Sequence, residues 1–507
     1  MAGSVARWAA LAGCLAGGAV GWARLADVPA DPPAEGFSAT RAMALVRGWA
    51  TAPRPSGSPQ HAATLSSVSD ALTAAGFVVT PHPFTIGDVR GVNLVATAPG
   101  ADDRDGVWLV AHSDSAPESP GASDDGFGLA VVVEAARALA VDGPPADLKV
   151  LITDAEELGL YGARAEVARA KGARRVVLNV EARGASGPVY MFQTAGPTRP
   201  VLAAWQRSGC RVQATSLART VYDALPNATD FLVFRRAGWT GYDFALIHDA
   251  WRYHTPDDTP AGLDPRSVQQ AGDCVTGLAR AWLDAGGAAA ATGPEDAAVY
   301  AQIAGTTFVV PSVVVRLAGA AALVVALARR RPDARGGVVL GVGAWLGAAV
   351  ASVAAGVAML VLFPYVQPDF WERVAEAPGA EGRFVALAVV GGVVPAAALT
   401  LARRWGPAER GWHGVSALLG AAAAIVAPTV GYAFVPGAFA AAFALRGRPW
   451  MAGGAAFAAG VVVAPVLQAI YPALTSRAAP VLAAMPLLML AWLAPGVRRE
   501  GAASQRR

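Results

Sequence analysis

Histidines and carboxylates that could bind a metal ion stand directly after apolar segments of this sequence. They are His112 and Asp114 after residues 107–111, Asp124 and Asp125 after a loop rich in Gly, Pro and Ser, Glu156 and Glu157 after residues 148–153, Glu181 after residues 175–180, and His254. Imidazole nitrogens and carboxylate oxygens are common ligands of Zn²⁺. A single Glu-Glu pair or His-x-Asp is usually part of a solvated loop, so it is their combination that predicts a metal site.

The apolar segments before these residues have the length and composition of buried strands. A segment with helical periodicity, residues 129–139, follows the Asp-Asp pair, and strand-like and helix-like segments alternate to about residue 283. We therefore expect an α/β fold, with a mostly parallel central sheet flanked by helices on both faces. Ligands bind at the carboxyl ends of the strands in such sheets, which is where the candidate ligands stand.

Two segments outside this region are apolar enough to meet a membrane. Residues 8–23 form an apolar run without a clear small-residue cleavage site, which favours an uncleaved anchor over a signal peptide. From residue 308 the chain consists largely of apolar runs, most of which reach the ~20 residues that a membrane span needs. These runs cover residues 308–328, 337–363, 384–402, 412–432, 433–446, 449–471 and 478–495.

These patterns predict four parts of the chain. We expect an N-terminal membrane anchor over residues 1–25, an α/β domain over 26–300, about seven transmembrane helices over 301–497 and a basic cytoplasmic tail over 498–507. Arginines cluster in alternate loops, as at residues 329–331, and short basic loops stay in the cytoplasm. The α/β domain is then expected outside the cytoplasm.

The charge of the chain is distributed unevenly. Its net charge is +3 at pH 7, but residues 37–300 hold 22 Lys and Arg against 28 Asp and Glu. An acidic domain is thus joined to a basic, apolar remainder, and hydrophobic residues make up 54% of the whole. Because the basic residues lie between apolar runs rather than along one stripe, we expect no nucleic-acid binding.

Three cysteines, Cys14, Cys210 and Cys274, are too few and too far apart for a cysteine zinc site. Cys210 and Cys274 are compatible either with a disulfide in an oxidising compartment or with two buried thiols. The sequence leaves these two alternatives open.

Five blocks of the sequence, in order, resemble the di-zinc aminopeptidase family of metallopeptidases, family M28. They are His112-x-Asp114, Gly121-Ala-x-Asp124-Asp125-Gly126, Asp154-Ala-Glu156-Glu157-x-Gly159, Glu181 and Tyr253-His254-Thr255. The resemblance covers roughly residues 40–285. The apolar remainder is similar to the membrane-bound branch of the family, which contains the endoplasmic-reticulum metallopeptidase and the vacuolar membrane protease.

The resemblance implies a role for each of these residues and two zinc ions per chain. Asp124 would bridge both ions, and each ion would have two further ligands, His112 with Glu181 and Glu157 with His254. Most secreted relatives have Asp where Glu181 stands, so Glu181 departs from their pattern. The resemblance also implies a cis peptide bond between Asp124 and Asp125.

The same resemblance implies the catalytic groups. Glu156 would be the general base, Asp114 would orient the imidazole of His112, and Tyr253 would donate a hydrogen bond to the oxyanion. Asp230 and Asp258 are expected to cap loops from buried positions. Arg183 is compatible with a substrate contact or with a structural salt bridge, and we expect the salt bridge.

The implied function is that of a membrane-anchored zinc exopeptidase, an aminopeptidase acting on peptides. A carboxypeptidase, a dipeptidase, a one-zinc glutaminyl cyclase and a catalytically silent binding or transport-associated membrane protein are the alternatives. The expected partners are peptide substrates and the lipid bilayer, and the oligomeric state is left open. Because the chain is rich in Ala, Gly and Arg and almost free of Lys, we expect a bacterial plasma membrane protein.

Overall fold

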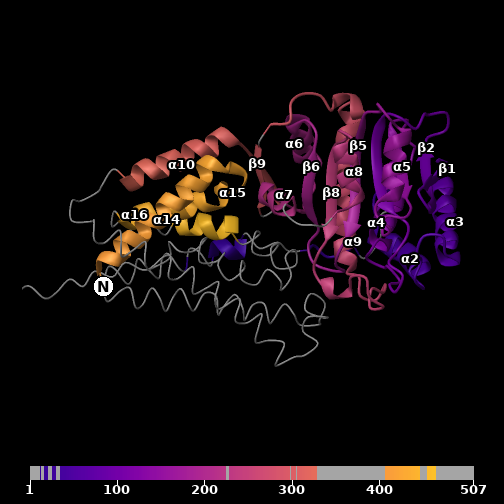
Figure 1. Ribbon diagram of the computed structural model, residues 1–507, viewed down its shortest axis with the longest axis horizontal. Coiled ribbons are helices and arrows are strands. Elements are labelled where there is room, and N and C mark those ends of the chain that lie inside the picture. The colour runs from indigo at the N-terminus through magenta and orange to yellow at the C-terminus, as the bar shows by residue number, and fades with distance from the viewer. Residues whose placement is uncertain are drawn as a thin grey trace, which may run out of the picture. The chain divides into compact units, whose positions relative to one another are not determined.

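The computed structural model describes part of the chain, and the described residues fall in two units. They are residues 12, 16–20, 25–29, 35–223, 228–296, 298–303, 305–327, 406–445, 451 and 454–463. One unit comprises residues 24–309, and the other comprises residues 1–23 and 310–507. The first unit contains all the candidate site residues (Figure 1).

An eight-stranded sheet runs through the first unit in the order β1-β2-β4-β3-β5-β8-β6-β7. Its strands are β1 (Val78–Ile86), β2 (Val89–Thr97), β3 (Gly106–His112), β4 (Leu148–Thr153), β5 (Arg175–Ala182), β6 (Tyr190–Ala195), β7 (Gln213–Ala214) and β8 (Thr240–Leu246). All residues of β3, β4, β5 and β8 are buried. This burial explains why the central strands have continuous apolar segments instead of an alternating pattern.

The sheet is mixed, so the prediction of a mostly parallel sheet was wrong. The neighbours β4, β3, β5 and β8 run parallel, but β1 pairs with β2, β2 with β4 and β6 with β8 in antiparallel fashion. Only Gly87 and Asp88 connect β1 to β2. A connection of two residues permits a hairpin, whereas parallel strands need a longer crossover.

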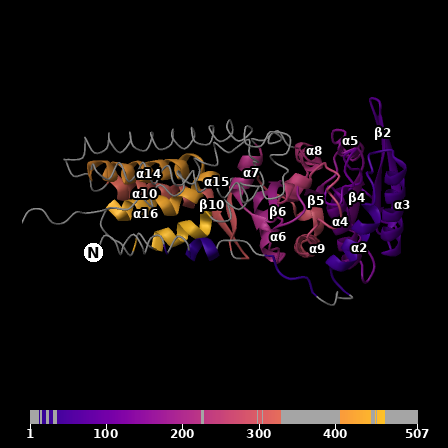
Figure 2. The same cartoon turned by 90° about the horizontal axis from the view of Figure 1, so that it is seen from below.

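Helices cover both faces of this sheet (Figure 2). One face packs against α2 (Ala39–Trp49), α3 (Pro59–Ala74), α4 (Gly126–Leu139), α6 (Thr198–Arg207) and α9 (Pro265–Asp284). The other face, which includes Trp108 and Val177, packs against α5 (Tyr161–Arg169) and α8 (Asp230–Arg236). Strand residues alternate between these two cores, so the sheet is held from both sides and its strand ends have fixed positions.

A disulfide joins Cys210, which follows α6, to Cys274 in α9. The pairing that the sequence left open is therefore present. The bond connects the segment after α6 to α9, and both helices pack on the same face of the sheet.

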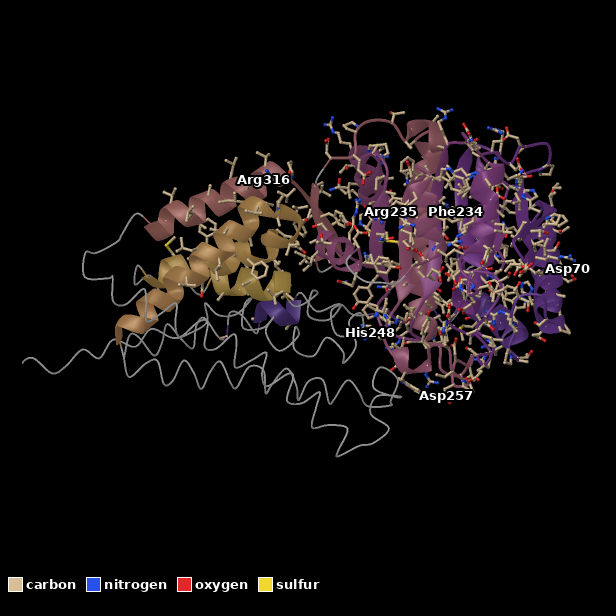
Figure 3. The ribbon with its side chains drawn as sticks, viewed as in Figure 1. Asp70, Phe234, Arg235, His248, Asp257 and Arg316 are labelled. Atoms are coloured by element: carbon tan, nitrogen blue, oxygen red, sulfur yellow. A yellow bond between two sulfur atoms is a disulfide. The ribbon has the colours of Figure 1, made fainter. Side chains whose placement is uncertain are left out.

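The described part of the second unit is helical. It contains α10 (Ser312–Leu327), α14 (Gly406–Val426), α15 (Pro428–Gly431) and α16 (Val435–Leu445). Within the part of the chain that the structure describes, none of the helices combines the length and the apolar character that crossing a bilayer requires. Arg316, inside the predicted span 308–328, is exposed on α10 (Figure 3).

Several predicted spans lie outside the described residues. These are the spans 337–363, 384–402 and 478–495, the tail 498–507 and most of the N-terminal anchor. The transmembrane organisation and the four domain boundaries stay predictions.

Candidate metal centre

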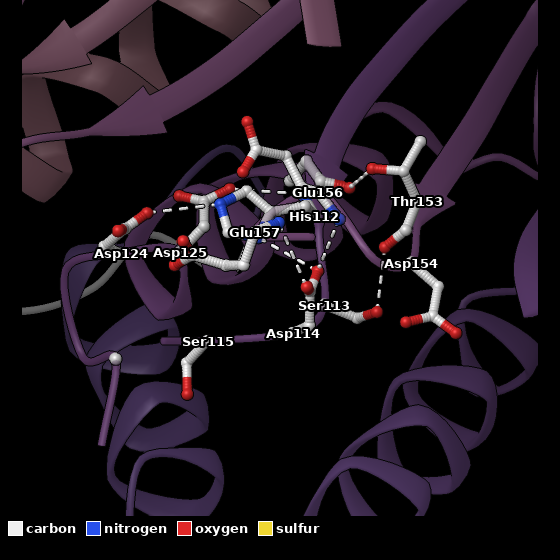
Figure 4. A network of polar contacts seen from close by, with 12 residues as sticks. His112, Ser113, Asp114, Ser115, Asp124, Asp125, Thr153, Asp154, Glu156 and Glu157 are labelled. Atoms are coloured by element: carbon white, nitrogen blue, oxygen red, sulfur yellow. Dashed lines mark hydrogen bonds and ion pairs between the residues drawn. The ribbon is translucent and has the colours of Figure 1, made fainter. Parts of the chain in front are cut away.

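The candidate ligands come from five segments that meet at one edge of the sheet. His112 is the last residue of β3, Glu181 lies near the end of β5, and Glu157 stands in the loop between β4 and α5. Asp124 stands shortly before α4, to which the loop after β3 leads (Figure 4). Because β3, β4 and β5 run parallel, their carboxyl ends lie at the same edge.

His254 reaches this edge from the long connection between β8 and α9. The same connection includes His248 and Asp257, both labelled in Figure 3. The backbone of His254 has a φ of 59°, in the left-handed region. This strained conformation is held at a residue whose side chain faces the acidic cluster.

Asp124 lies between the two histidines and faces one with each carboxylate oxygen. Its Oδ1 is 3.2 Å from Nε2 of His112, and its Oδ2 is 3.0 Å from Nε2 of His254. The two histidines each face one more carboxylate, since Nε2 of His112 is 3.5 Å from Oε2 of Glu181 and Nε2 of His254 is 3.1 Å from Oε2 of Glu157. The Asp124 carboxylate thus joins two groups of ligand atoms.

These atoms fit a bound cation better than they fit one another. Nε2 of His254 is close to two carboxylate oxygens but makes no hydrogen bond of acceptable geometry among the described residues. Oε1 of Glu157 and Oε1 of Glu181 are likewise buried without a hydrogen-bond partner in that part of the chain. Buried acceptors without partners are costly, and a divalent cation among nitrogen and carboxylate ligands would satisfy them. Two ligand groups, His112/Asp125/Glu181 and Asp124/Glu157/His254, have the spacing of metal sites.

Asp125, which was not predicted as a ligand, belongs to the first of these groups. Its fully buried carboxylate accepts hydrogen bonds from the backbone N–H groups of Gly128, at 2.9 Å, and His112, at 3.3 Å. It therefore caps the N-terminus of α4. The peptide bond between Asp124 and Asp125 is cis, as the family resemblance implied.

Burial and neighbouring charges shift the pKa values of the cluster in opposite directions. Burial alone would lower the pKa of His254, but Asp124 and Glu157 raise it to about 10. Burial alone would raise the pKa of Asp124, but the two histidines hold it well below its usual range. Burial raises the pKa of Glu157 and of Glu181, with the charge of Asp124 adding to the effect. The cluster is therefore short of positive charge, which a metal ion would supply.

Asp114 connects a histidine to the loop that carries the two glutamates. Its Oδ1 is 3.4 Å from Nδ1 of His112. Its two oxygens also accept hydrogen bonds from the backbone N–H groups of Glu156, at 3.1 Å, and Glu157, at 3.2 Å. One buried carboxylate thus lies beside the ring of a candidate ligand and positions the β4–α5 loop.

Glu156 and Tyr253 lie next to the ligands. Burial raises the pKa of Glu156 well above its usual value, and the charges of Glu181 and Asp230 add to the shift. The ring of Tyr253 stacks on that of His254, with 3.7 Å between the ring centroids. Burial also raises the pKa of the Tyr253 hydroxyl, so it is a hydrogen-bond donor at neutral pH.

Arg54 supports the metal-site loop and was not predicted from the sequence. The buried guanidinium donates hydrogen bonds to the carbonyl oxygens of Ser113, Pro120 and Gly121, at both ends of the loop before Asp124. Gly121 has a φ of 65°, and a Cβ there would lie 2.5 Å from the carbonyl oxygen of Asp124. The loop therefore needs glycine at this position.

His61 and Asp258 complete this support. Nε2 of His61 is 2.9 Å from Oγ of Ser113 and 3.4 Å from Oδ1 of Asp154, so it bridges the loops after β3 and β4. The Asp258 carboxylate accepts hydrogen bonds from the backbone N–H groups of Ser123 and Asp124. The predicted loop-capping role of Asp258 matches these bonds, whereas nothing in the sequence around His61 indicates its contacts.

Comparisons with known proteins agree with this architecture. The model of peptidase family M28 matches residues 93–279. Endoplasmic reticulum metallopeptidase 1 of Rattus norvegicus is 34% identical over 177 residues, 33% of this chain and 20% of the relative. The vacuolar membrane protease of Candida albicans (strain WO-1) is 31% identical over 182 residues, 35% of this chain and 21% of the relative. The chain thus spans about a fifth of the length of these curated relatives.

Among solved structures, a zinc aminopeptidase from Bacillus subtilis is 16% identical. The alignment covers 50% of this chain and 95% of that chain, with a TM-score of 0.39.

Proposed function

We propose that this chain, whose residues 93–279 form a domain of peptidase family M28, is a zinc-dependent aminopeptidase that removes residues from the free amino end of peptides. The observation that carries the proposal is the Asp124 carboxylate, which faces His112 with one oxygen and His254 with the other. A carboxylate between two ligand groups is suited to hold two metal ions close together.

We further propose that two zinc ions bind there. Asp124 would be shared by both, His112 and Glu181 would hold one, and Glu157 and His254 would hold the other. When bound, the ions supply Lewis-acid polarisation of the scissile carbonyl and lower the pKa of a water molecule. The donor set of imidazole nitrogens and carboxylate oxygens suits zinc.

The remaining chemistry belongs to side chains of the chain itself. Glu156 acts as the general base: it accepts a proton from the attacking water and delivers it to the leaving amine. It adjoins Glu157, so one carboxylate is directed to a ligand group while its neighbour is free for proton transfer. Tyr253, stacked on His254, donates a hydrogen bond to the negative charge that develops on the carbonyl oxygen. Asp114 contacts both His112 and the loop that carries Glu156, and so fixes their relative positions.

The charge of the site favours an aminopeptidase over a carboxypeptidase. Carboxylates outnumber histidines in the cluster, and the sheet edge presents acidic groups from three segments, the loop before α4, the β4–α5 loop and β5. An acidic site attracts the ammonium group of a free amino terminus. A dipeptidase remains compatible with the same charge, because a dipeptide also carries this group.

We propose that the chain is anchored in the plasma membrane and that its α/β unit lies outside the cytoplasm. One relative is named a vacuolar membrane protease, and another is named for the endoplasmic reticulum. The Cys210–Cys274 disulfide supports an oxidising compartment. The basic residues 329–331, which follow the predicted span 308–328, support the same orientation.

The proposal is tested with the full chain purified in detergent and a panel of aminoacyl substrates, each with a free and with an N-acetylated amine. We expect cleavage of the free substrates, loss of cleavage on acetylation, and loss of activity with a chelator that zinc restores. Equal cleavage of blocked and free peptides would contradict aminopeptidase action.

A further inference from the structure

Arg183 stands two residues after Glu181, and its side chain has neither an ion pair nor a hydrogen bond within the part of the chain that the structure describes. The structural salt bridge expected from the sequence is therefore not found among those residues. The buried arginines Arg54 and Arg175 have polar partners: Arg54 donates to three backbone carbonyls, and Arg175 pairs with Glu166. The Arg183 guanidinium instead lies over the ring of Tyr253, a contact that uses none of its N–H donors.

The backbone holds Arg183 at a defined place. Its N–H donates a 2.7 Å hydrogen bond to the carbonyl of Leu246, so it continues the pairing of β5 with β8 beyond the end of β5. Alternate residues of an extended chain face the same side, which puts Arg183 on the side of Glu181. The side chain is partly exposed, so a solute can reach it.

The guanidinium lies one aromatic ring away from a candidate metal ligand. Its Cζ is 5.8 Å from the centre of the Tyr253 ring, and the same ring stacks on that of His254, with 3.7 Å between the ring centroids. The cation thus lies beside the centre at which we place the scissile bond, yet it forms no ion pair with the ligand carboxylates. A planar guanidinium is suited to bind a carboxylate through two parallel hydrogen bonds.

We propose that Arg183 binds the terminal α-carboxylate of a short peptide whose amino end lies at the metal centre. An extended peptide advances by ~3.3–3.6 Å per residue, so the carboxylate of the first or second residue after the scissile bond is within range of Arg183. The enzyme then prefers dipeptides or tripeptides with a free carboxyl group. This inference rests on the aminopeptidase function proposed above and names the substrate class of that site.

The test compares substrates that differ only in their terminal charge. A dipeptide and a tripeptide with a well-cleaved first residue are each assayed as the free acid and as the carboxyl amide, with kcat and KM determined separately. The proteins are wild type, Arg183→Gln, Arg183→Lys and the control Arg47→Gln, which removes the same charge from an exposed position on α2. The ratio of kcat/KM for acid and amide, measured on one preparation, does not depend on the fraction of folded enzyme.

We expect the wild type and Arg47→Gln to prefer the free acid by about tenfold or more at one of the two lengths, mainly through KM. Arg183→Gln should lower kcat/KM for the free acid to nearly the value for its amide and should leave kcat/KM for the amide unchanged. Arg183→Lys should keep part of the preference, because an ammonium retains the charge but not the planar fork.

Three results would overturn the inference. The first is a wild type that does not prefer the free acid to the amide. The second is an Arg183→Gln variant that loses activity equally on acid and amide. The third is weaker cleavage by Arg183→Gln of an amide with Glu after the scissile bond, because Arg183 would then bind an acidic side chain and not the terminal carboxylate. In each case cleavage of the amides at their amino end would leave the proposed aminopeptidase function intact. Absence of amino-terminal cleavage from every substrate would instead contradict that function.

Discussion

At the scale of single residues, the neighbours Glu156 and Glu157 have different proposed roles, general base and metal ligand. The two side chains are adjacent, and the backbone N–H groups of both are held by Asp114. Glu157 faces His254, whereas the side chain of Glu156 makes no contact of this kind with either histidine among the described residues. In the proposed mechanism the base and the ligand are therefore different residues, and mutation can distinguish their roles.

Glu156→Gln should lower kcat by about 10²–10⁴, the usual contribution of a general base, and should leave the melting temperature and the bound metal unchanged. The amide keeps the shape of the side chain but cannot accept the proton. Steady-state kinetics on the aminoacyl substrates measure the effect, with the exposed Glu118→Gln as control. A near-wild-type rate would remove Glu156 from the role of base.

The five candidate ligands could be picked out from the sequence because their types and spacing are unusual together and three of them, His112, Glu157 and Glu181, stand at or just after the end of a strand. The residues that support the cluster could not. Arg54 and His61 act through contacts with Ser113 and the loop before Asp124, more than fifty positions away in the sequence. No local pattern marks such partners, because these contacts exist only once the chain is folded.

At the scale of elements, α5 is fixed to the start of β5 by a buried ion pair. Nη1 of Arg175 is 2.9 Å from Oε1 of Glu166, and the guanidinium lies 3.7 Å from the ring centroid of Trp108 and 4.6 Å from that of Trp239. Burial alone would raise the pKa of Glu166, but hydrogen bonds from His82 and Arg169 and the charge of Arg175 lower it to about 2. A carboxylate with a lowered pKa stabilises the fold when it is ionised.

Glu166→Gln should therefore lower the melting temperature of the metal-free α/β unit by about 5–10 °C at pH 7. The stabilisation by Glu166 is complete above pH ~4.5, where the carboxyl also ionises in the unfolded chain, and is lost as the pH falls towards ~2. The difference in melting temperature from wild type should shrink over that interval. Tryptophan fluorescence of the full chain in chelator measures it, and a difference that stays constant down to the lowest pH would contradict the explanation.

The strands themselves were predictable, since residues 107–111, 148–153 and 175–180 fall within β3, β4 and β5. Their apolar runs follow from burial on both faces. Such apolar runs do not indicate whether neighbouring strands pair in parallel or antiparallel fashion. The pairing direction depends on the connections between strands, as the hairpin at Gly87 and Asp88 shows. It also depends on which edge of the sheet is unpaired when a later strand such as β6 is added.

At the scale of the whole molecule, an acidic α/β unit is joined in the sequence to a basic, apolar remainder. The Cys210–Cys274 disulfide and the arginines at 329–331 bear on the same question, the side of the membrane on which the unit lies. An oxidising compartment and the retention of basic loops in the cytoplasm both favour the outside.

A phosphatase reporter that is active only outside the cytoplasm tests this orientation. Fused near Gly293, at the end of the α/β unit, it should be active; fused near Asp333, after the basic residues, it should be silent. A second reporter, which is active only in the cytoplasm and is fused at the same two positions, serves as the control. The opposite pattern would put the metal centre in the cytoplasm and change the pool of available peptides.

The central claim is that Asp124 is shared by two metal ions, and the most direct test is the amount of zinc bound per folded chain in wild type and in Asp124→Ala. Both proteins are loaded with zinc and freed of excess metal by gel filtration. Their zinc content per chain is then measured by elemental mass spectrometry. We expect two zinc ions per wild-type chain and almost none in Asp124→Ala, because in the proposed centre this substitution removes a ligand of each ion. One zinc ion per wild-type chain, or two retained by Asp124→Ala, would contradict the shared-carboxylate centre.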